Sequence, residues 1–345
     1  MHLETITIKD IARLSGVGVS TVSRAINNHP DINEETKAKI MEIIQEYNYV
    51  PNNSARNLKR SQSKTIAVLI KGISNPFFSK MLTVFEEEIQ KKKYSFILQQ
   101  VKEQEDEIDV AIELIKEKRL KGIVFLGGFF THSKEKLKQL NIPFVLSTIG
   151  LPEEFQDAGY STVAVDDVKE SYKMVNYLCS IGHQKIAIIA ASEDDESIGK
   201  LRLEGYEKAL KDHHIPLDSE LICRMKPDIG SYSMENGYVV TKELLESGKV
   251  FTALYAISDS VAIGACKAIF DAGRRVPEDY CVAGFDGLDI AYYYQPSITT
   301  IRQPVEEMAR ESIHILFDII RKKAPERNII FPAELVVRQS TRNLK

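Results

Sequence analysis

Two different hydrophobic patterns divide the chain near residue 65. Before that point, apolar side chains recur every three or four residues, which is typical of amphipathic helices. This spacing predicts three short helices, over residues 6–15, 19–27 and 34–47. The first two are separated by Gly16-Val17-Gly18, and two helices joined by a short glycine-containing turn predict a helix-turn-helix.

Beyond residue 65, short apolar runs alternate with amphipathic segments. The runs predict strands over residues 65–70, 94–99, 122–127, 144–148, 185–191, 252–257 and 281–285. The amphipathic segments predict helices over residues 77–92, 106–118, 168–180, 199–212, 235–247 and 260–272. This alternation is typical of parallel sheets built from βαβ units. The number of strands predicts two doubly wound lobes, with loops at the carboxyl ends of the strands facing a cleft.

A polar, basic stretch separates the two patterns. Residues 52–64 contain four Lys or Arg and no Asp or Glu, and they lack a long apolar face. The stretch predicts a linker with a short helix near residues 54–58. The sequence therefore predicts three parts, residues 1–50, 51–64 and 65–345.

Charge is distributed unevenly along the chain. The formal net charge is −4, but residues 1–64 hold nine Lys or Arg against seven Asp or Glu. That part therefore carries +2, and the remainder carries −6. A locally basic region on an acidic body indicates that contact with nucleic acid is confined to one end of the protein.

Composition and motifs argue against several other classes of protein. The first residues lack the basic start and apolar run of a signal peptide, and no stretch approaches the roughly 18 apolar residues of a membrane span. We therefore expect a cytoplasmic protein with no membrane contact.

The four cysteines are far apart, which predicts no metal site and no disulfide framework, and we expect no cofactor. The GxSxG and HExxH motifs are missing from the sequence, so we predict no enzyme.

Several segments together resemble one protein family. They are TIKDIARLSGVGVSTVSRAIN (residues 7–27), YVPNNSARNLKRSQSKTIAVLI (49–70), RVPEDYCVAGFD (275–286) and FPAELVVRQSTR (331–342). With the segments between them, they resemble the lactose-repressor (LacI/GalR) family of bacterial transcription regulators over essentially the whole chain. A solute-binding transport protein would share the two-lobed core, but it would lack the helix-turn-helix.

The resemblance implies an all-α helix-turn-helix headpiece, a hinge helix in residues 51–64, and an α/β core like that of periplasmic binding proteins. The family's chain crosses between the two lobes several times. We expect the first lobe to comprise residues 65–161 and 292–323, and the second lobe residues 162–291 and 324–341. The implied function is a transcriptional repressor that binds double-stranded operator DNA as a homodimer. A small carbohydrate-related effector in the inter-lobe cleft is expected to switch it.

The segment VGVSTVSRAINN (residues 17–28) holds the residues expected to read DNA. A recognition helix enters the major groove by its N-terminal residues, which must be small and polar. Val19 can contact a thymine methyl group, and Arg24 can bind guanine with two hydrogen bonds. The expected headpiece contacts are Val19, Ser20, Thr21, Ser23, Arg24 and Asn27. The alternative is a helix that only packs a small bundle, with Arg24 in solvent.

The resemblance assigns the hinge residues Ala55, Leu58 and Lys59 to the minor groove, where a pair of Leu58 side chains would wedge into one base step. The alternative is a disordered linker. We expect disorder in the free protein and a helix on the operator, since a short isolated helix is marginal in water.

Two kinds of evidence predict the effector residues. Aromatic and polar side chains follow the first and third core strands, and the resemblance adds the polar residues of later loops. The predicted set is Ile73, Asn75, Phe77, Phe78, Phe129, Thr148, Arg202, Tyr232, Ser258 and Asp286. The alternatives are lobe core for the phenylalanines, a surface salt bridge with Glu204 or Asp195 for Arg202, and a loop cap for Asp286.

One departure from the family bears on the effector. Many sugar-responsive members carry an Asp-Arg pair where this chain has Thr148 and Ile149. The loss of both charges indicates a less polar, differently shaped or phosphorylated ligand, or one that is not a sugar. A phosphate would favour Arg202.

The resemblance also implies a two-fold dimer on a near-palindromic operator. The expected interface residues are Met81, Val84 and Tyr293. One alternative function stays open. The segment ISNPFF and the closing RQST also occur in catabolite-control regulators, which a phosphoprotein partner switches.

Overall fold

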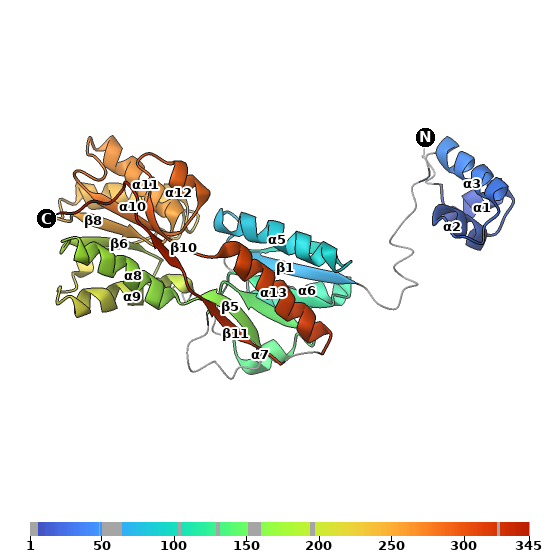
Figure 1. Ribbon diagram of the computed structural model, residues 1–345, viewed down its shortest axis with the longest axis horizontal. Coiled ribbons are helices and arrows are strands. Elements are labelled where there is room, and N and C mark those ends of the chain that lie inside the picture. Colours follow the sequence, from blue (N-terminus) through green and yellow to red (C-terminus); the bar gives the residue numbers. More distant parts are fainter. Residues whose placement is uncertain are drawn as a thin grey trace. The chain divides into compact units, whose positions relative to one another are not determined.

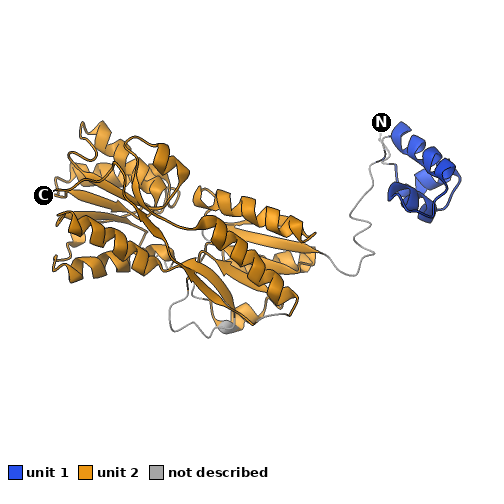
Figure 2. Cartoon of the chain, in the orientation of Figure 1, with its two compact units in different colours: residues 1–63 blue, residues 64–345 orange. Residues whose placement is uncertain are grey.

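The computed structural model describes residues 6–47, 49, 64–102, 105–128, 132–150, 160–193, 197–322 and 325–344. The chain forms two compact units, residues 1–63 and residues 64–345 (Figure 2). The predicted site residues Ala55, Leu58, Lys59 and Phe129 lie outside the described residues.

The first unit contains the three predicted helices, α1 (Ile8–Ser15), α2 (Val19–Ile26) and α3 (Glu34–Glu46). The start of α1 is fixed by Asp10, whose carboxylate accepts the backbone N–H of Thr7 at 3.0 Å. Gly16 ends it with a φ of 71°, a conformation that glycine adopts without strain. Asn33 caps α3 by accepting the N–H groups of Glu35 and Thr36.

A small apolar core holds these helices together. Ile11, Val22 and Ile40 come from the three different helices and are fully buried, and two alanines fill the space between them. The periodicity therefore identified the core face of each helix. Leu14, an apolar residue of α1, lies outside this core and is 42% exposed.

The second unit contains two six-stranded sheets (Figure 1). The first sheet is wholly parallel, in the order β11 (Asn328–Phe331), β5 (Ser161–Val165), β4 (Phe144–Ser147), β3 (Gly122–Leu126), β1 (Thr65–Lys71) and β2 (Ser95–Val101). The second has the order β12 (Glu334–Val336), β10 (Thr299–Arg302), β9 (Cys281–Asp286), β8 (Ala253–Ala256), β6 (Ile186–Ala190) and β7 (Ile222–Arg224). Only β12 pairs in the antiparallel sense among the strands described.

Helices cover both sheets, which makes each lobe a layered α/β structure. The helices of the first lobe are α5 (Phe77–Lys91), α6 (Glu107–Lys118), α7 (Lys134–Lys138) and α13 (Val305–Ile320). The helices of the second lobe are α8 (Asp167–Ser180), α9 (Ile198–Asp212), α10 (Met234–Glu246), α11 (Asp259–Asp271) and α12 (Asp289–Tyr293), with a 3₁₀ turn at Ser219–Leu221. Figure 1 shows α5 beside α13, α8 beside α9, and α10 beside α11. The two doubly wound lobes are thus confirmed.

The chain passes between the lobes three times, and the crossings correct the predicted lobe boundaries. Residues 162–165 were expected in the second lobe, but β5 pairs with β4 and β11 in the first sheet. Residues 292–302 were expected in the first lobe, but β10 pairs with β9 in the second sheet. Residues 324–331 were expected in the second lobe, whereas β11 closes the first sheet. These strands are short, and their place in a sheet is decided by hydrogen bonds to strands that are distant in the sequence.

Candidate functional site

The first candidate site is the exposed face of α2. Val19 at its N-terminus is 42% exposed although it is apolar, and Ser20 and Arg24 are exposed beside it. Val22 and Ala25 point the other way, into the headpiece core. The helix therefore presents a small, polar N-terminal end with one arginine to solvent.

The remaining predicted headpiece residues flank this face. Thr21 and Ser23 are half-buried, so only part of each side chain can reach a partner. Asn27 is exposed, and its side-chain amide donates to the carbonyl oxygen of Ser23 at 2.6 Å. The arrangement supplies hydroxyl and amide groups at the edge of the exposed face.

The second candidate site is a cleft of about 630 Å³ in the core unit. Its walls come from both lobes, and its volume lies within the range of small-ligand pockets. Seven of the ten predicted effector residues line it. They are Asn75, Phe77, Phe78, Thr148, Arg202, Tyr232 and Asp286.

Two other predicted effector residues do not reach this cleft. Ile73 is 41% exposed in the turn after β1, and it does not line the cleft although its neighbour Gly72 does. Ser258 is buried and caps α11, where its hydroxyl oxygen accepts the N–H of Val261 at 3.3 Å. Both assignments are corrected, because one side chain faces solvent and the other is used by a helix terminus.

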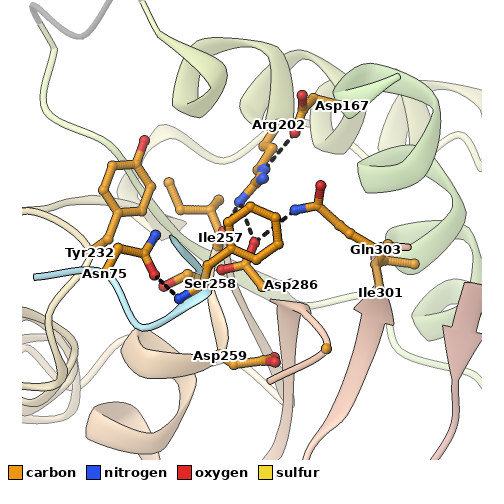
Figure 3. A network of polar contacts seen from close by, with 12 residues as sticks. Asn75, Asp167, Arg202, Tyr232, Ile257, Ser258, Asp259, Asp286, Ile301 and Gln303 are labelled. Atoms are coloured by element: carbon orange, nitrogen blue, oxygen red, sulfur yellow. Dashed lines mark hydrogen bonds and ion pairs between the residues drawn. The ribbon is translucent and has the colours of Figure 1, made fainter. Parts of the chain in front are cut away.

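Arg202 lies at the centre of a buried polar network (Figure 3). Its Nε donates to Asp167 at 2.8 Å, and its Nη1 donates to the carbonyl oxygen of Ile257 at 2.6 Å and lies 3.5 Å from an oxygen of Asp286. The Cζ atom of the guanidinium group lies 3.7 Å from the ring centre of Phe285. Only 2% of the side chain is exposed, so the surface salt bridge considered above is wrong.

Asp286 joins this network from the end of β9. Its Oδ1 accepts the side-chain amide of Gln303 at 3.0 Å, so the carboxylate is not a loop cap. Its Oδ2 is buried and has no hydrogen-bond partner among the residues described. An acceptor of this kind, at the wall of a cleft, is suited to a ligand that presents an O–H or N–H group.

Burial changes the protonation of these groups. It raises the pKa of Asp286 to about 7, because the ionised form loses its hydration. Burial and the charge of Asp286 together raise the pKa of Asp259, at the start of α11, to about 8. Burial alone would lower the pKa of Arg202, but the charges of Asp167 and Asp286 raise it above its usual value. The arginine is thus firmly cationic.

Three of the predicted cleft residues have an unusual backbone conformation. The φ angles are 70° for Thr148, 57° for Tyr232 and 111° for Asp286. Positive φ values are unfavourable for side chains larger than glycine, and they concentrate at ligand-binding sites. The spacing of residues along the chain does not predict these positive φ angles.

Two phenylalanines of the first lobe line the cleft. Phe77 and Phe78 pack edge to face, with ring centres 5.6 Å apart. Both side chains also belong to the hydrophobic core of the lobes, so this pair lies in the core and lines the cleft, and its effector contact stays a prediction. Lys71 lies beside them, and its ammonium group is 3.6 Å from the carboxylate of Glu107.

Sequence reasoning missed several residues of the site. Lys71 and Gln303 line the cleft, and Asp167 binds Arg202 from behind. Lys71 directly follows the predicted strand 65–70, a position at which ligand-binding residues are common and which could have identified it. Gln303 and Asp167 lie where the chain crosses between lobes, and the predicted boundaries misplaced those crossings.

The predicted dimer residues differ in their exposure. Met81 and Val84 on α5 are 0% and 7% exposed, because they pack inside their own lobe. They cannot contribute much area to an interface, and this assignment is corrected. Tyr293 is 80% exposed, and its assignment stays a prediction.

Comparison with known proteins establishes the family. Residues 7–52 match the family described as bacterial regulatory proteins, lacI family, and residues 175–341 match a periplasmic binding protein-like domain. The chain is 42% identical to the HTH-type transcriptional regulator MalR of Clostridium butyricum, covering 98% of this chain and 99% of that protein. It is 33% identical to the probable repressor ExuR of Bacillus subtilis, with coverages of 98% and 99%. The chain belongs to the lacI family of bacterial regulatory proteins.

Solved structures agree with this assignment. A complex of the transcriptional regulator CelR with cellobiose is 26% identical and superposes with a TM-score of 0.70, covering 97% of this chain and 99% of that chain. A lacI-family regulator from Enterococcus faecium with bound ribose is 29% identical, with a TM-score of 0.69 and coverages of 82% and 100%.

The predicted resemblance and fold class are therefore confirmed. The protein is a DNA-binding transcriptional regulator of the repressor type with an effector-binding core, and it is not an enzyme. No helix among the described residues is long and apolar enough to cross a membrane. Within the same part of the chain, no group of three potential metal ligands is found.

Proposed function

We propose that the protein binds a near-palindromic operator as a homodimer and that a neutral sugar in the cleft switches this binding. The single observation that carries the proposal is the composition of the cleft. Two aromatic rings of the first lobe line the same cleft as hydrogen-bonding groups of the second lobe, among them the buried Asp286. Aromatic faces suit the apolar face of a sugar ring, and a few converging polar groups fix the orientation of its hydroxyls.

The ion pairs of Arg202 favour a neutral ligand at this residue over a phosphorylated one. Arg202 is already paired with the carboxylates of Asp167 and Asp286, so it has little charge left for a phosphate. The Oδ2 atom of Asp286 has no partner among the described residues, and a sugar hydroxyl can donate to it when the carboxyl is ionised or accept from it when the carboxyl is protonated. The structural relatives named above hold cellobiose and ribose, which are neutral sugars. A phosphate is therefore not the ligand that Arg202 favours.

On the DNA side, Val19, Ser20 and Arg24 are proposed to contact base edges in the major groove. Thr21, Ser23 and Asn27 are proposed to contact the backbone, which positions the helix without reading sequence. Ala55, Leu58 and Lys59 are proposed to enter the minor groove. The exposure of Val19 supports the first of these roles, since a free apolar side chain is suited to a thymine methyl group.

A homodimer is supported by an exposed apolar patch on and beside α12. Ile290, Tyr292 and Tyr293 are 44%, 61% and 80% exposed. Contiguous apolar groups on a surface mark interaction sites. The second copy of the chain would cover this patch and would bring two headpieces to the two halves of the operator.

The proposed switch is a shift between conformations of the two lobes. A sugar can change operator affinity only by binding one conformation better than the other. A tenfold preference is equivalent to about 1.4 kcal/mol per site. Whether the sugar releases or strengthens repression depends on which conformation it prefers.

Selection of bound sequences from a random DNA library tests this function. We expect enrichment of a two-fold symmetric site with a flexible pyrimidine–purine step at its centre, where a Leu58 pair would kink the duplex. The selected site then serves as a probe for neutral sugars such as cellobiose and ribose. Absence of enrichment, both alone and with these sugars, would contradict the proposal.

A further inference from the structure

Three short segments carry the chain between the two lobes of the core. Residue 166 connects β5 to α8, residues 303–304 connect β10 to α13, and residues 332–333 connect β11 to β12. A change in the angle between lobes must be absorbed at these crossings, because the elements on either side belong to rigid layers.

The first crossing is tied to the cleft by Asp167. This residue begins α8 directly after the crossing, and its side chain is 3% exposed. Its carboxylate accepts the Nε–H of Arg202 at 2.8 Å, and Arg202 lines the cleft. A displacement of the guanidinium group therefore acts directly on the residue that follows the crossing.

The second crossing is tied to the cleft by Gln303. Its side-chain amide donates to Oδ1 of Asp286 at 3.0 Å, and its backbone N–H donates to the carbonyl oxygen of Asp286 at 3.2 Å. Two hydrogen bonds to one residue fix both the position and the orientation of Gln303. The crossing and Asp286 are thus expected to move together.

The third crossing is held by α8. Ala333 donates its N–H to Glu170 at 3.3 Å and accepts the ammonium group of Lys173 at 2.7 Å, and these two side chains form an ion pair. Asp167, Glu170 and Lys173 follow one another at intervals of three residues, so they lie along one side of the helix. The first turns of α8 therefore contact the first and third crossings.

We infer that Asp167 and Gln303 are positioning residues that link the Arg202–Asp286 pair of the cleft to two of the three crossings and so set the angle between the lobes. The inference rests on the proposed function in one respect, since the ligand that would use this link is the sugar proposed above. A sugar hydroxyl that donates to Oδ2 of Asp286 acts on both crossings through the hydrogen bonds already described.

Burial gives this link its strength. Asp167, Arg202, Asp286 and Gln303 are all at least 95% buried, so water cannot replace a lost partner at low cost. A buried hydrogen-bond network keeps one arrangement of its side chains until a second arrangement offers every polar group a partner. The crossings are then expected to adopt discrete positions.

The test measures the distance between the lobes in the absence of any ligand. Spin labels are placed at Lys116→Cys on α6 and Lys208→Cys on α9, two exposed positions, in the full chain. The native thiols react slowly by comparison, since burial raises the pKa of Cys179 and Cys223 to about 11 and that of Cys266 to about 12. Dilution with unlabelled chain removes distances between protomers.

Gln303→Leu and Asp167→Asn are compared with the otherwise unchanged labelled chain. The matched control is Ser312→Ala, which removes a buried hydrogen bond of 2.9 Å to Ser147 inside the first lobe. We expect each hinge variant to shift or broaden the inter-lobe distance distribution by more than roughly 2 Å, the size of a clear rearrangement. The control Ser312→Ala should lower the Tm by about as much as the hinge variants do, but it should leave the inter-lobe distance distribution unchanged.

Distributions for Gln303→Leu that match those of the unchanged chain and the control would overturn the inference. If Asp167→Asn does not fold, the result for Gln303→Leu alone decides the test. Gln303→Leu is expected to fold, because Gln303 is uncharged and its removal leaves Arg202 and Asp286 paired with each other. The measurement needs neither sugar nor DNA. A failure of the proposed function, seen as no response of operator binding to sugars, is therefore distinguishable from a failure of the hinge link.

Discussion

The two candidate sites of this regulator are built in opposite ways. The exposed face of α2 gathers its residues from one stretch of the chain, Val19 to Asn27, on one helix. The cleft gathers Asn75 from a loop, Arg202 from α9, Asp286 from the end of β9 and Gln303 from a crossing. A local site depends on one helix and its cap, whereas a distributed site depends on the whole core. Substitutions should therefore have different consequences at the two places.

The largest effect is expected at the centre of the cleft network. Arg202→Met leaves Asp167 and Asp286 buried without their cation, which should destabilise the core by about 3–5 kcal/mol. Calorimetry of the full chain should show a lower melting temperature for the core transition. The matched control is Arg224→Met, at an exposed arginine that also lines the cleft. Equal decreases in melting temperature for the two variants would show that the buried network contributes no more to stability than an exposed arginine does.

The next effect concerns the local site. Arg24→Ala should reduce the preference for the selected operator over unrelated DNA by about 1–3 kcal/mol, the usual contribution of a two-hydrogen-bond contact to guanine. Binding to unrelated DNA should remain sensitive to salt, and the core should melt as before. Lys39→Ala removes the same charge from an exposed position on α3 and serves as control. Unchanged discrimination in Arg24→Ala would remove this residue from the base-reading set.

The contrast between the sites also explains what the sequence could predict. The headpiece helices and most core strands follow from local periodicity, as Val22 and the apolar run of β6 illustrate. Thr148, Arg202 and Asp286 were placed in the cleft by resemblance, and the structure brings them there.

The remaining features depend on contacts that no local pattern encodes. Asp167 and Gln303 acquire their roles from partners 35 and 17 residues away along the chain. Ser258 was misassigned because a helix cap and a ligand contact require the same residue type. Met81 was expected at the interface by resemblance, but it is buried on α5, which packs against α13.

A smaller effect is expected from the protonation of the buried carboxyl groups. Burial raises the pKa of Asp259 to about 8 and that of Asp286 to about 7, so the folded core holds protons that the unfolded chain releases near pH 4. The stability of the core should therefore fall as the pH rises from 5 to 8. Thermal melts of Asp259→Asn should show a weaker fall over this range. If the stability of Asp259→Asn falls with pH as steeply as that of the unchanged chain, the raised pKa of Asp259 is contradicted.

The smallest effect is expected at the start of α2. Gly18 is its N-cap and provides no side-chain hydrogen bond. Gly18→Ser should stabilise the headpiece by a few tenths of a kcal/mol, because a serine oxygen can accept an N–H group of the first turn. Urea unfolding of the headpiece followed by circular dichroism would measure this gain. Gly16→Ser is the contrasting variant, since the φ of 71° at that position makes any side chain unfavourable.

The most direct test of the account measures operator affinity by fluorescence anisotropy with and without a saturating neutral sugar. For the unchanged chain we predict a change of at least about tenfold in Kd for one such sugar, equivalent to 1.4 kcal/mol. Asp286→Asn, which alters the acceptor in the cleft, should bind the operator but lose this response. Operator affinity that no neutral sugar changes, or a full response in Asp286→Asn, would contradict the claim that the cleft controls DNA binding.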